Sequence, residues 1–150
     1  MEYKYISKSD KDTLTVAQNL ESEKFSNMVI CLYGELGCGK TVFTKGFAQA
    51  MEIEENITSP TFNIVKEYTS GELPLYHMDV YRLDEADESI GFQDYFQKGG
   101  VTIIEWADII KDELPQERLD IKFKVIDDNK RVLIFIPHGE KYEDLCSAVL

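Results

Sequence analysis

Residues 34–41, Gly34-Glu35-Leu36-Gly37-Cys38-Gly39-Lys40-Thr41, match the phosphate-binding pattern Gly-x-x-x-x-Gly-Lys-[Ser/Thr] at every fixed position. An apolar run of strand character, residues 28–33, precedes them, and residues 41–51 follow with apolar side chains at helical spacing. In a strand–loop–helix unit of this kind, glycines let successive backbone N–H groups turn toward one point, where the helix N-terminus adds partial positive charge. The stretch therefore predicts a nucleoside triphosphate site in an α/β fold.

The positions within this motif have different expected roles. Lys40 is expected to reach the β- and γ-phosphates, and the Thr41 hydroxyl is expected to hold Mg²⁺. Cys38 is either a small residue that fits the loop, which we favour, or a thiol made redox-sensitive by the helix N-terminus. The residues predicted to contact the nucleotide are Gly34, Glu35, Leu36, Gly37, Cys38, Gly39, Lys40, Thr41 and Val42.

Length and composition indicate an ordinary globular protein. A chain of 150 residues is expected to form one domain, residues 1–150, and can bury a substantial core. The sequence contains no apolar run of membrane-spanning length and no signal-peptide core near residue 1, so we expect a cytoplasmic protein without a membrane partner. Its three cysteines lack disulfide-framework or metal-site spacing and are expected to be reduced thiols.

The charge balance constrains the partners. Acidic residues outnumber basic ones by 28 to 16, which gives a net charge of −12. Nucleic-acid binding through phosphates needs clustered Lys and Arg, and the sequence shows no basic stripe. We therefore expect no strong direct nucleic-acid surface. The acidic excess indicates either a solvated surface or a face that docks on a basic protein.

The hydrophobic pattern predicts a three-layer P-loop NTPase-like fold, with a mixed β-sheet flanked by helices and a C-terminal β-hairpin followed by a helix. Strands are expected at 3–6, 28–33, 62–68, 73–79 and 101–104, and helices from Ser9 to near Phe25, at 41–51, around 92–96, at 107–113 and at 140–150. The C-terminal hairpin is expected to alternate buried and polar positions. The expected buried positions are Ile121, Phe123 and Val125 on its first strand and Val132, Ile134 and Ile136 on its second.

Two carboxylates are candidates to complete a magnesium site. Glu105 follows the most strand-like apolar run and is the candidate metal ligand, whereas Asp79 follows another strand and is the candidate near the γ-phosphate. Side chains at the carboxyl ends of strands line the crevice of open α/β sheets, although either residue can also be an ordinary strand-end acid. The predicted catalytic residues are Lys40, Asp79 and Glu105.

Several neighbouring side chains leave alternatives open. His77 lies two residues before Asp79, on the same strand face, where it is expected to orient Asp79 or to contact a partner rather than to ligate metal. Arg82 either stabilises transition-state charge or pairs with the acidic run at residues 84–88. Trp106, the only tryptophan, is either a core anchor or an exposed contact.

Taken together, these motifs resemble one bacterial family. Residues 34–41, Ser59-Pro60-Thr61-Phe62, residues 77–83 and Ile104-Glu105-Trp106 closely resemble the TsaE family (formerly YjeE), in the same order. The resemblance implies a small Mg²⁺-dependent ATPase required to make threonylcarbamoyl-adenosine at position 37 of tRNAs that decode codons beginning with A. It also implies partnership with TsaD, which transfers the group, and TsaB, which binds TsaD, while TsaC makes the activated precursor. The tRNA would then be reached through the partners.

Carried onto this chain, the resemblance implies that Thr41 and Glu105 hold Mg²⁺ and that Asp79 is the functionally required acid. It also implies a switch-like loop at Ser59, Pro60, Thr61 and Phe62. The remaining candidates for switching or partner contact are His77, Tyr81, Arg82 and Trp106. Adenine contacts are expected near residues 9–11 and 129–131, without assignment to a residue.

Two other functions remain open on the residues alone. A small-molecule kinase would usually clamp phosphates with several arginines from a lid, and this chain has only Arg82, Arg118 and Arg131. A nucleotide-sensing module that barely hydrolyses ATP needs the same loop and is not distinguished by sequence. Because no strong arginine-finger candidate is present, slow hydrolysis by the isolated protein is expected.

Overall fold

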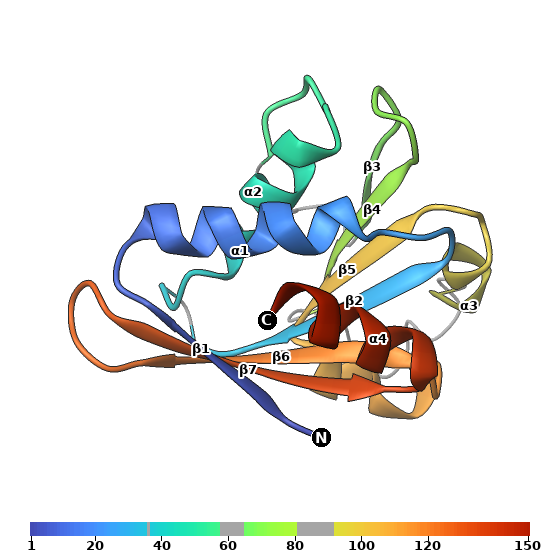
Figure 1. Ribbon diagram of the computed structural model, residues 1–150. Helices are drawn as coiled ribbons and strands as arrows, with labels where there is room; N and C mark the ends of the chain where they lie inside the picture. Colours follow the sequence, from blue (N-terminus) through green and yellow to red (C-terminus); the bar gives the residue numbers. More distant parts are fainter. Residues whose placement is uncertain (36, 58–64, 81–91) are drawn as a thin grey trace.

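The computed structural model describes residues 1–35, 37–57, 65–80 and 92–150, which form one seven-stranded sheet with flanking helices (Figure 1). The elements in chain order are β1 (Tyr3–Ser7), α1 (Asp10–Ser22), β2 (Met28–Tyr33), α2 (Lys40–Ala50), β3 (Val65–Tyr68), β4 (Leu75–Asp79), α3 (Phe92–Phe96), β5 (Val101–Glu105), the 3₁₀ helix η2 (Ala107–Glu113), β6 (Arg118–Val125), β7 (Arg131–His138) and α4 (Glu140–Val149).

The sheet is mixed, with the strand order β1-β7-β6-β2-β5-β4-β3. The four central strands β6, β2, β5 and β4 run parallel, whereas β3, β7 and β1 pair antiparallel with their neighbours. Every side chain of β5 is buried, as its continuous apolar run predicts for a central strand. The predicted α/β P-loop-like fold with a C-terminal hairpin and helix is confirmed.

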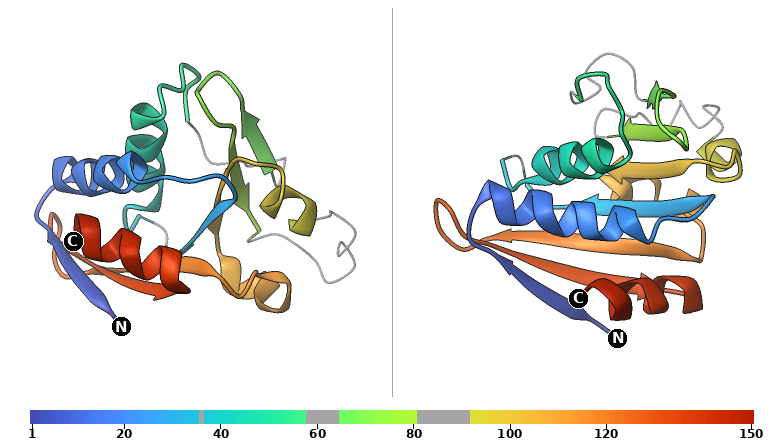
Figure 2. Two further views of the ribbon diagram at one scale, coloured as in Figure 1. Left: turned by 45° about the vertical axis from the view of Figure 1, so that its right-hand side comes forward. Right: turned by 45° about the horizontal axis from the view of Figure 1, so that its top comes forward.

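Two apolar clusters lie on opposite faces of the sheet. The larger packs α1, α2 and α4 against one face and includes Leu20, Phe43, Phe47 and Tyr142. The smaller lies against the other face, below β2, β4 and β5, and includes Phe96 and residues of η2. Figure 2 shows α1, α2 and α4 together on one side of the strands. Helix α2, which begins at the phosphate-binding motif, is therefore fixed on the larger core.

The helix before β2 begins as its sequence predicts but ends earlier. Ser9 caps α1 by accepting a hydrogen bond from the Asp12 backbone N–H at 3.2 Å, and the Asp12 side chain accepts one from the N–H of Lys8, the residue before the cap, at 2.9 Å. The second bond differs from the usual capping box, in which that side chain binds the N–H of the cap residue itself. The helix ends at Ser22 rather than near Phe25. Of the described helices, none is long and apolar enough to cross a membrane.

The predicted inward positions of β7 are wrong. Leu133 and Phe135 are fully buried in the larger cluster, whereas Val132, Ile134 and Ile136 lie on the opposite face and are partly exposed. Both sets are apolar, so alternation within the strand cannot say which set faces the core. On β6, Ile121 and Phe123 are buried as predicted, but Val125 is 56% exposed.

Candidate nucleotide-binding site

The loop between β2 and α2 has the backbone conformation that its glycines allow. Gly39, the residue that caps α2, has φ 108°, a conformation that side chains with a Cβ rarely adopt. Gly34 is closely packed, because a Cβ there would lie 2.6 Å from the Cys38 Sγ and 3.0 Å from the Phe123 carbonyl oxygen. Gly39 has no side chain to cap the helix, so the first-turn N–H groups of α2 can serve a phosphate.

Lys40 is held at the site by two contacts. Its side chain is buried, with the residue only 4% exposed, and its ammonium group donates to the Gly34 carbonyl oxygen at 2.7 Å. The same group lies 3.9 Å from the centre of the Trp106 ring, a cation–π contact. Trp106 follows β5 with φ 62° and packs partly against the smaller cluster, so it is both a packing residue and a wall of this site.

The two predicted carboxylates lie side by side. Asp79 is the register partner of Glu105 across β4 and β5, and Glu105 also pairs with Leu32 near the end of β2. The strand ends are joined by the Val80 N–H, which donates to the Glu105 carbonyl oxygen at 3.3 Å. Because these three strands run parallel, their carboxyl ends meet beside the phosphate-binding loop. Asp79 and Glu105 therefore lie together at that edge of the sheet, as the sequence led us to expect.

His77 has a different partner from either of those expected. Its Nε2 lies 2.7 Å from Glu105 Oε2, and the residue is completely buried. A carboxylate only accepts hydrogen bonds, so with Glu105 ionised Nε2 donates and Glu105 is oriented by it. The expectation that the His77 side chain contacts a partner is contradicted by its burial. Its Nδ1 has no hydrogen-bond partner within the described residues.

Cys38 behaves as the small packing residue that the sequence favours. The residue is buried in the larger cluster and lies against Gly34. Burial raises the pKa of its thiol, and the nearby Lys40 charge only partly opposes this shift. Because the thiolate is the reactive form, the raised pKa disfavours oxidation at neutral pH.

Two residues outside the predicted set border the loop. Phe123 on β6 lies beside Gly34 and within 4 Å of where a Cβ of Gly39 would sit. Arg131, the first residue of β7, donates from Nη2 to the Gly37 carbonyl oxygen at 3.5 Å. Both come from the C-terminal hairpin, far from the loop in sequence, so local spacing gave no signal for them. Arg131 does lie within the segment expected near the adenine.

Some predicted residues lie outside the described part of the chain. These are Leu36 of the loop, the switch-like segment Ser59, Pro60, Thr61 and Phe62, and Tyr81 and Arg82. Their predicted roles stay predictions. The other predicted nucleotide contacts, Glu35, Gly37, Thr41 and Val42, lie on the described part of the loop and on the first turn of α2.

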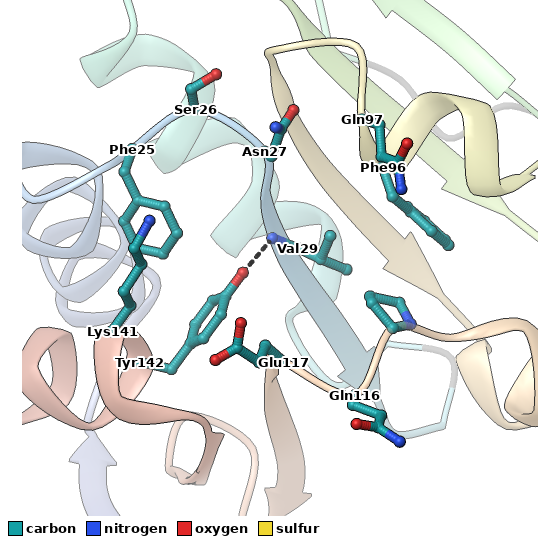
Figure 3. A pocket seen from close by; sticks show the side chains of 11 residues that line it. Phe25, Ser26, Asn27, Val29, Phe96, Gln97, Gln116, Glu117, Lys141 and Tyr142 are labelled. Carbon is teal, nitrogen blue, oxygen red and sulfur yellow. Dashed lines mark hydrogen bonds between the residues drawn. The ribbon is translucent and has the colours of Figure 1, made fainter.

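A pocket of about 570 Å³ lies at the opposite end of the parallel strands (Figure 3). Phe25, Asn27, Phe96, Glu117 and Tyr142 contribute to its wall. The Tyr142 hydroxyl accepts from the Val29 N–H at 2.9 Å and thereby fixes α4 to β2, and burial raises the pKa of Tyr142 to about 12. Ligands of open α/β sheets bind at the carboxyl ends of strands, so the loop side is the candidate site.

Comparisons with known proteins agree with the motifs and with this geometry. The sequence profile of the family described as "Threonylcarbamoyl adenosine biosynthesis protein TsaE" matches residues 7–133. This chain belongs to the TsaE family. Its relatives in that family are named tRNA threonylcarbamoyladenosine biosynthesis proteins.

Two TsaE proteins and one solved structure show how far the family likeness extends. The Bacillus subtilis protein is 51% identical over 118 residues, covering 79% of this chain and 75% of the relative. The Treponema pallidum protein is 41% identical over 131 residues, covering 84% and 94%. The crystal structure of Bacillus subtilis YdiB superposes with a TM-score of 0.86 at 40% identity, covering 99% of this chain and 94% of that one.

Proposed function

We propose that this TsaE-family chain is a cytoplasmic, Mg²⁺-dependent ATPase that acts on the TsaB–TsaD complex. In this role it supports threonylcarbamoyl modification of adenosine 37 in tRNAs that read codons beginning with A. The observation that carries the proposal is the convergence of Lys40, Asp79 and Glu105 at one edge of the sheet, beside a glycine-rich helix N-terminus. Membership in the TsaE family supports the assignment to threonylcarbamoyladenosine biosynthesis.

The residues present fit a nucleotide with a magnesium ion. Gly34 and Gly39 adopt backbone conformations that suit glycine, and Lys40 is the first residue of α2, whose first turn carries no acidic side chain. In the proposed site Lys40 binds the β- and γ-phosphates, while Thr41 and Glu105 hold the ion. When bound, Mg²⁺ neutralises charge that develops on the phosphates. In this proposal Asp79, the register partner of Glu105, orients the attacking water.

The two alternative functions, a small-molecule kinase and a nucleotide-sensing module, would differ from an ATPase in what happens to the phosphate of ATP. A kinase would transfer phosphate to a metabolite, and a sensing module would bind ATP with little hydrolysis. Arg118, one of the few arginines and the first residue of β6, donates to Asp120 Oδ1 at 3.0 Å and to the Pro115 carbonyl oxygen at 2.9 Å. Arg118 is therefore held by these local contacts rather than available to clamp phosphates, and we favour the ATPase. Phosphate release measured with TsaB–TsaD and tRNA present tests the choice.

Replacing Glu105 is expected to weaken magnesium-dependent binding selectively. In Glu105→Gln the side chain still accepts from His77 but loses the charge that attracts the cation, so Mg·ATP affinity should fall roughly ten-fold or more. Calorimetric titrations with ATP, with and without Mg²⁺, measure the difference. Equal weakening of both forms would make Glu105 a structural residue, and Asp79 would take its place as the candidate ligand.

His77 is expected to act through Glu105. His77→Leu removes the donor that orients the carboxylate, and losing such a support typically lowers metal affinity by roughly 10–100-fold. His77→Gln, which keeps a donor, should restore much of the loss. The control is His138→Leu, because His138 forms a similar pair with Asp120 at 2.8 Å on β6 and β7. The readouts are Mg²⁺ affinity with nucleotide bound and Trp106 fluorescence; equal loss in all three variants would contradict the role.

A further inference from the structure

The strand β7 is apolar on both of its faces. Leu133 and Phe135 enter the larger core, and Val132, Ile134 and Ile136 point to the other side of the sheet. Strands of continuous apolar sequence are typical of sheets that are covered on both faces, whereas a solvated face of an antiparallel pair is normally polar. The neighbouring strand β6 follows that normal pattern, with Lys122 and Lys124 pointing outward. The outward side chains of β7 therefore need an explanation.

This outward surface continues onto β1. Ile6 pairs in register with Val132 and is 54% exposed, and Lys4 pairs with Ile134. On the other side of β7, Lys124 pairs with Val132 and Lys122 with Ile134. Opposing residues of antiparallel strands share a face, so these side chains form one surface. We call it the open face, and its members are Lys4, Ile6, Lys122, Lys124, Val132, Ile134 and Ile136.

Within the described part of the chain, neither of the two apolar clusters packs over the open face. Helices α1, α2 and α4 lie against the opposite side of these strands (Figures 1 and 2). The second cluster, which does lie on this side, draws its described members from β2 to β5, α3 and η2 and takes none from β1 or β7. An apolar surface left in this position commonly marks a protein contact site.

The charge on the open face is opposite to that of the whole chain. The chain carries −12, yet the exposed charged side chains of this face are the three lysines Lys4, Lys122 and Lys124, whereas Asp120, the register partner of Ile136, is buried. The neighbouring carboxylate on β6, Asp120, is already engaged by Arg118 and His138. A second copy docked face to face would place lysines against lysines. The surface instead complements an apolar patch bordered by carboxylates.

We propose that the open face is the docking surface for a protein that presents an apolar patch bordered by Asp or Glu side chains, and that the TsaB–TsaD complex carries this patch. The identity of the occupant rests on the proposed function. The position suits that function, because Arg131 at the start of β7 contacts the Gly37 carbonyl oxygen of the phosphate-binding loop. A protein bound to the open face would therefore contact the strand whose first residue, Arg131, reaches the phosphate-binding loop.

Two pairs of substitutions test the proposal against purified TsaB–TsaD complex. Val132→Thr with Ile134→Thr removes apolar contact but keeps β-branched side chains, and should lower affinity roughly ten-fold or more, mainly through faster dissociation. Lys122→Glu with Lys124→Glu should mainly slow association and reverse its salt dependence. The control is Lys45→Glu with Lys141→Glu, two exposed lysines on α2 and α4, away from this face. ATP affinity and thermal unfolding, measured alongside, should change little.

The outcomes separate the surface from the function. Loss of binding in both face variants, with binding kept by the control, supports the open face as the docking surface. Unchanged binding in the face variants overturns it while leaving the proposed function intact. Failure of the unsubstituted protein to bind TsaB–TsaD overturns the proposed function together with the occupant named here. Self-association of the unsubstituted protein in sedimentation experiments, abolished by the face variants, would overturn the proposal in favour of a dimer.

Discussion

The isolated protein is expected to hydrolyse ATP slowly, and the TsaB–TsaD complex is expected to accelerate it by up to roughly 10³–10⁵-fold, the effect of an arginine finger supplied in trans. A phosphate-binding loop with magnesium positions the reacting groups but leaves the transition-state charge poorly stabilised. The described site supplies Lys40 and two carboxylates. Of the two arginines that the structure describes, Arg118 is held away from this site and Arg131 lies at its border.

The arrangement of those arginines is the reason to expect help from a partner. Arg118 is bound by Asp120, and the attraction of that carboxylate raises the pKa of its guanidinium despite partial burial. Arg131 borders the loop, but its Nη1 donates to the carbonyl oxygens of Asp127, Asp128 and Lys130, at 2.8, 3.3 and 3.2 Å. It is engaged by its own hairpin rather than pointed at the carboxylates.

The experiment compares turnover for the protein alone, with TsaB–TsaD, and with TsaB–TsaD plus tRNA, across a salt series. Stimulation should weaken as salt rises, because charges at a docking surface are screened. Arg131→Ala is the matched test for an arginine acting in cis. It should leave the slow basal turnover at saturating ATP nearly unchanged, since the proposal assigns catalytic assistance to the partner. Fast turnover by the protein alone, unaffected by TsaB–TsaD, would refute activation by the partner and favour the kinase.

Lys40→Ala is expected to abolish productive ATP binding. Charge-assisted hydrogen bonds to phosphate contribute roughly 1.5–3 kcal/mol each, so affinity should fall at least about ten-fold. The structure adds a spectroscopic readout, because the Lys40 ammonium lies 3.9 Å from the ring centre of Trp106, the only tryptophan. Nucleotide titrations followed by Trp106 fluorescence and by calorimetry should therefore both report the loss.

A control on the same helix makes the Lys40 result specific. Lys45 is exposed on α2, and Lys45→Ala removes the same charge from the same element without touching the loop. Its ATP affinity should match that of the unsubstituted protein. Thermal unfolding of both variants checks that the loop substitution has not unfolded the chain. An unchanged ATP dissociation constant in Lys40→Ala would remove Lys40 from the phosphate site.

The sequence by itself determined the phosphate-binding unit and most of the elements around it. Gly34, Gly39 and Lys40 occupy fixed positions in a short motif, so their roles follow from local backbone geometry. The buried run ending at Glu105 also identified a central strand, because continuous apolar residues indicate burial on both faces. The carboxylates were placed at the correct edge because parallel strands align their carboxyl ends.

Tertiary structure alone decided which side chains meet across distant segments. The pairing of His77 with Glu105 depends on the register of β4 against β5, and Arg131 reaches Gly37 only because the C-terminal hairpin folds back beside the loop. The sequence likewise left open which side chains of β7 face the core, because Val132 and Leu133 are equally suited to burial. Period-two alternation identifies a strand, but only packing against helices selects the buried face when both faces are apolar.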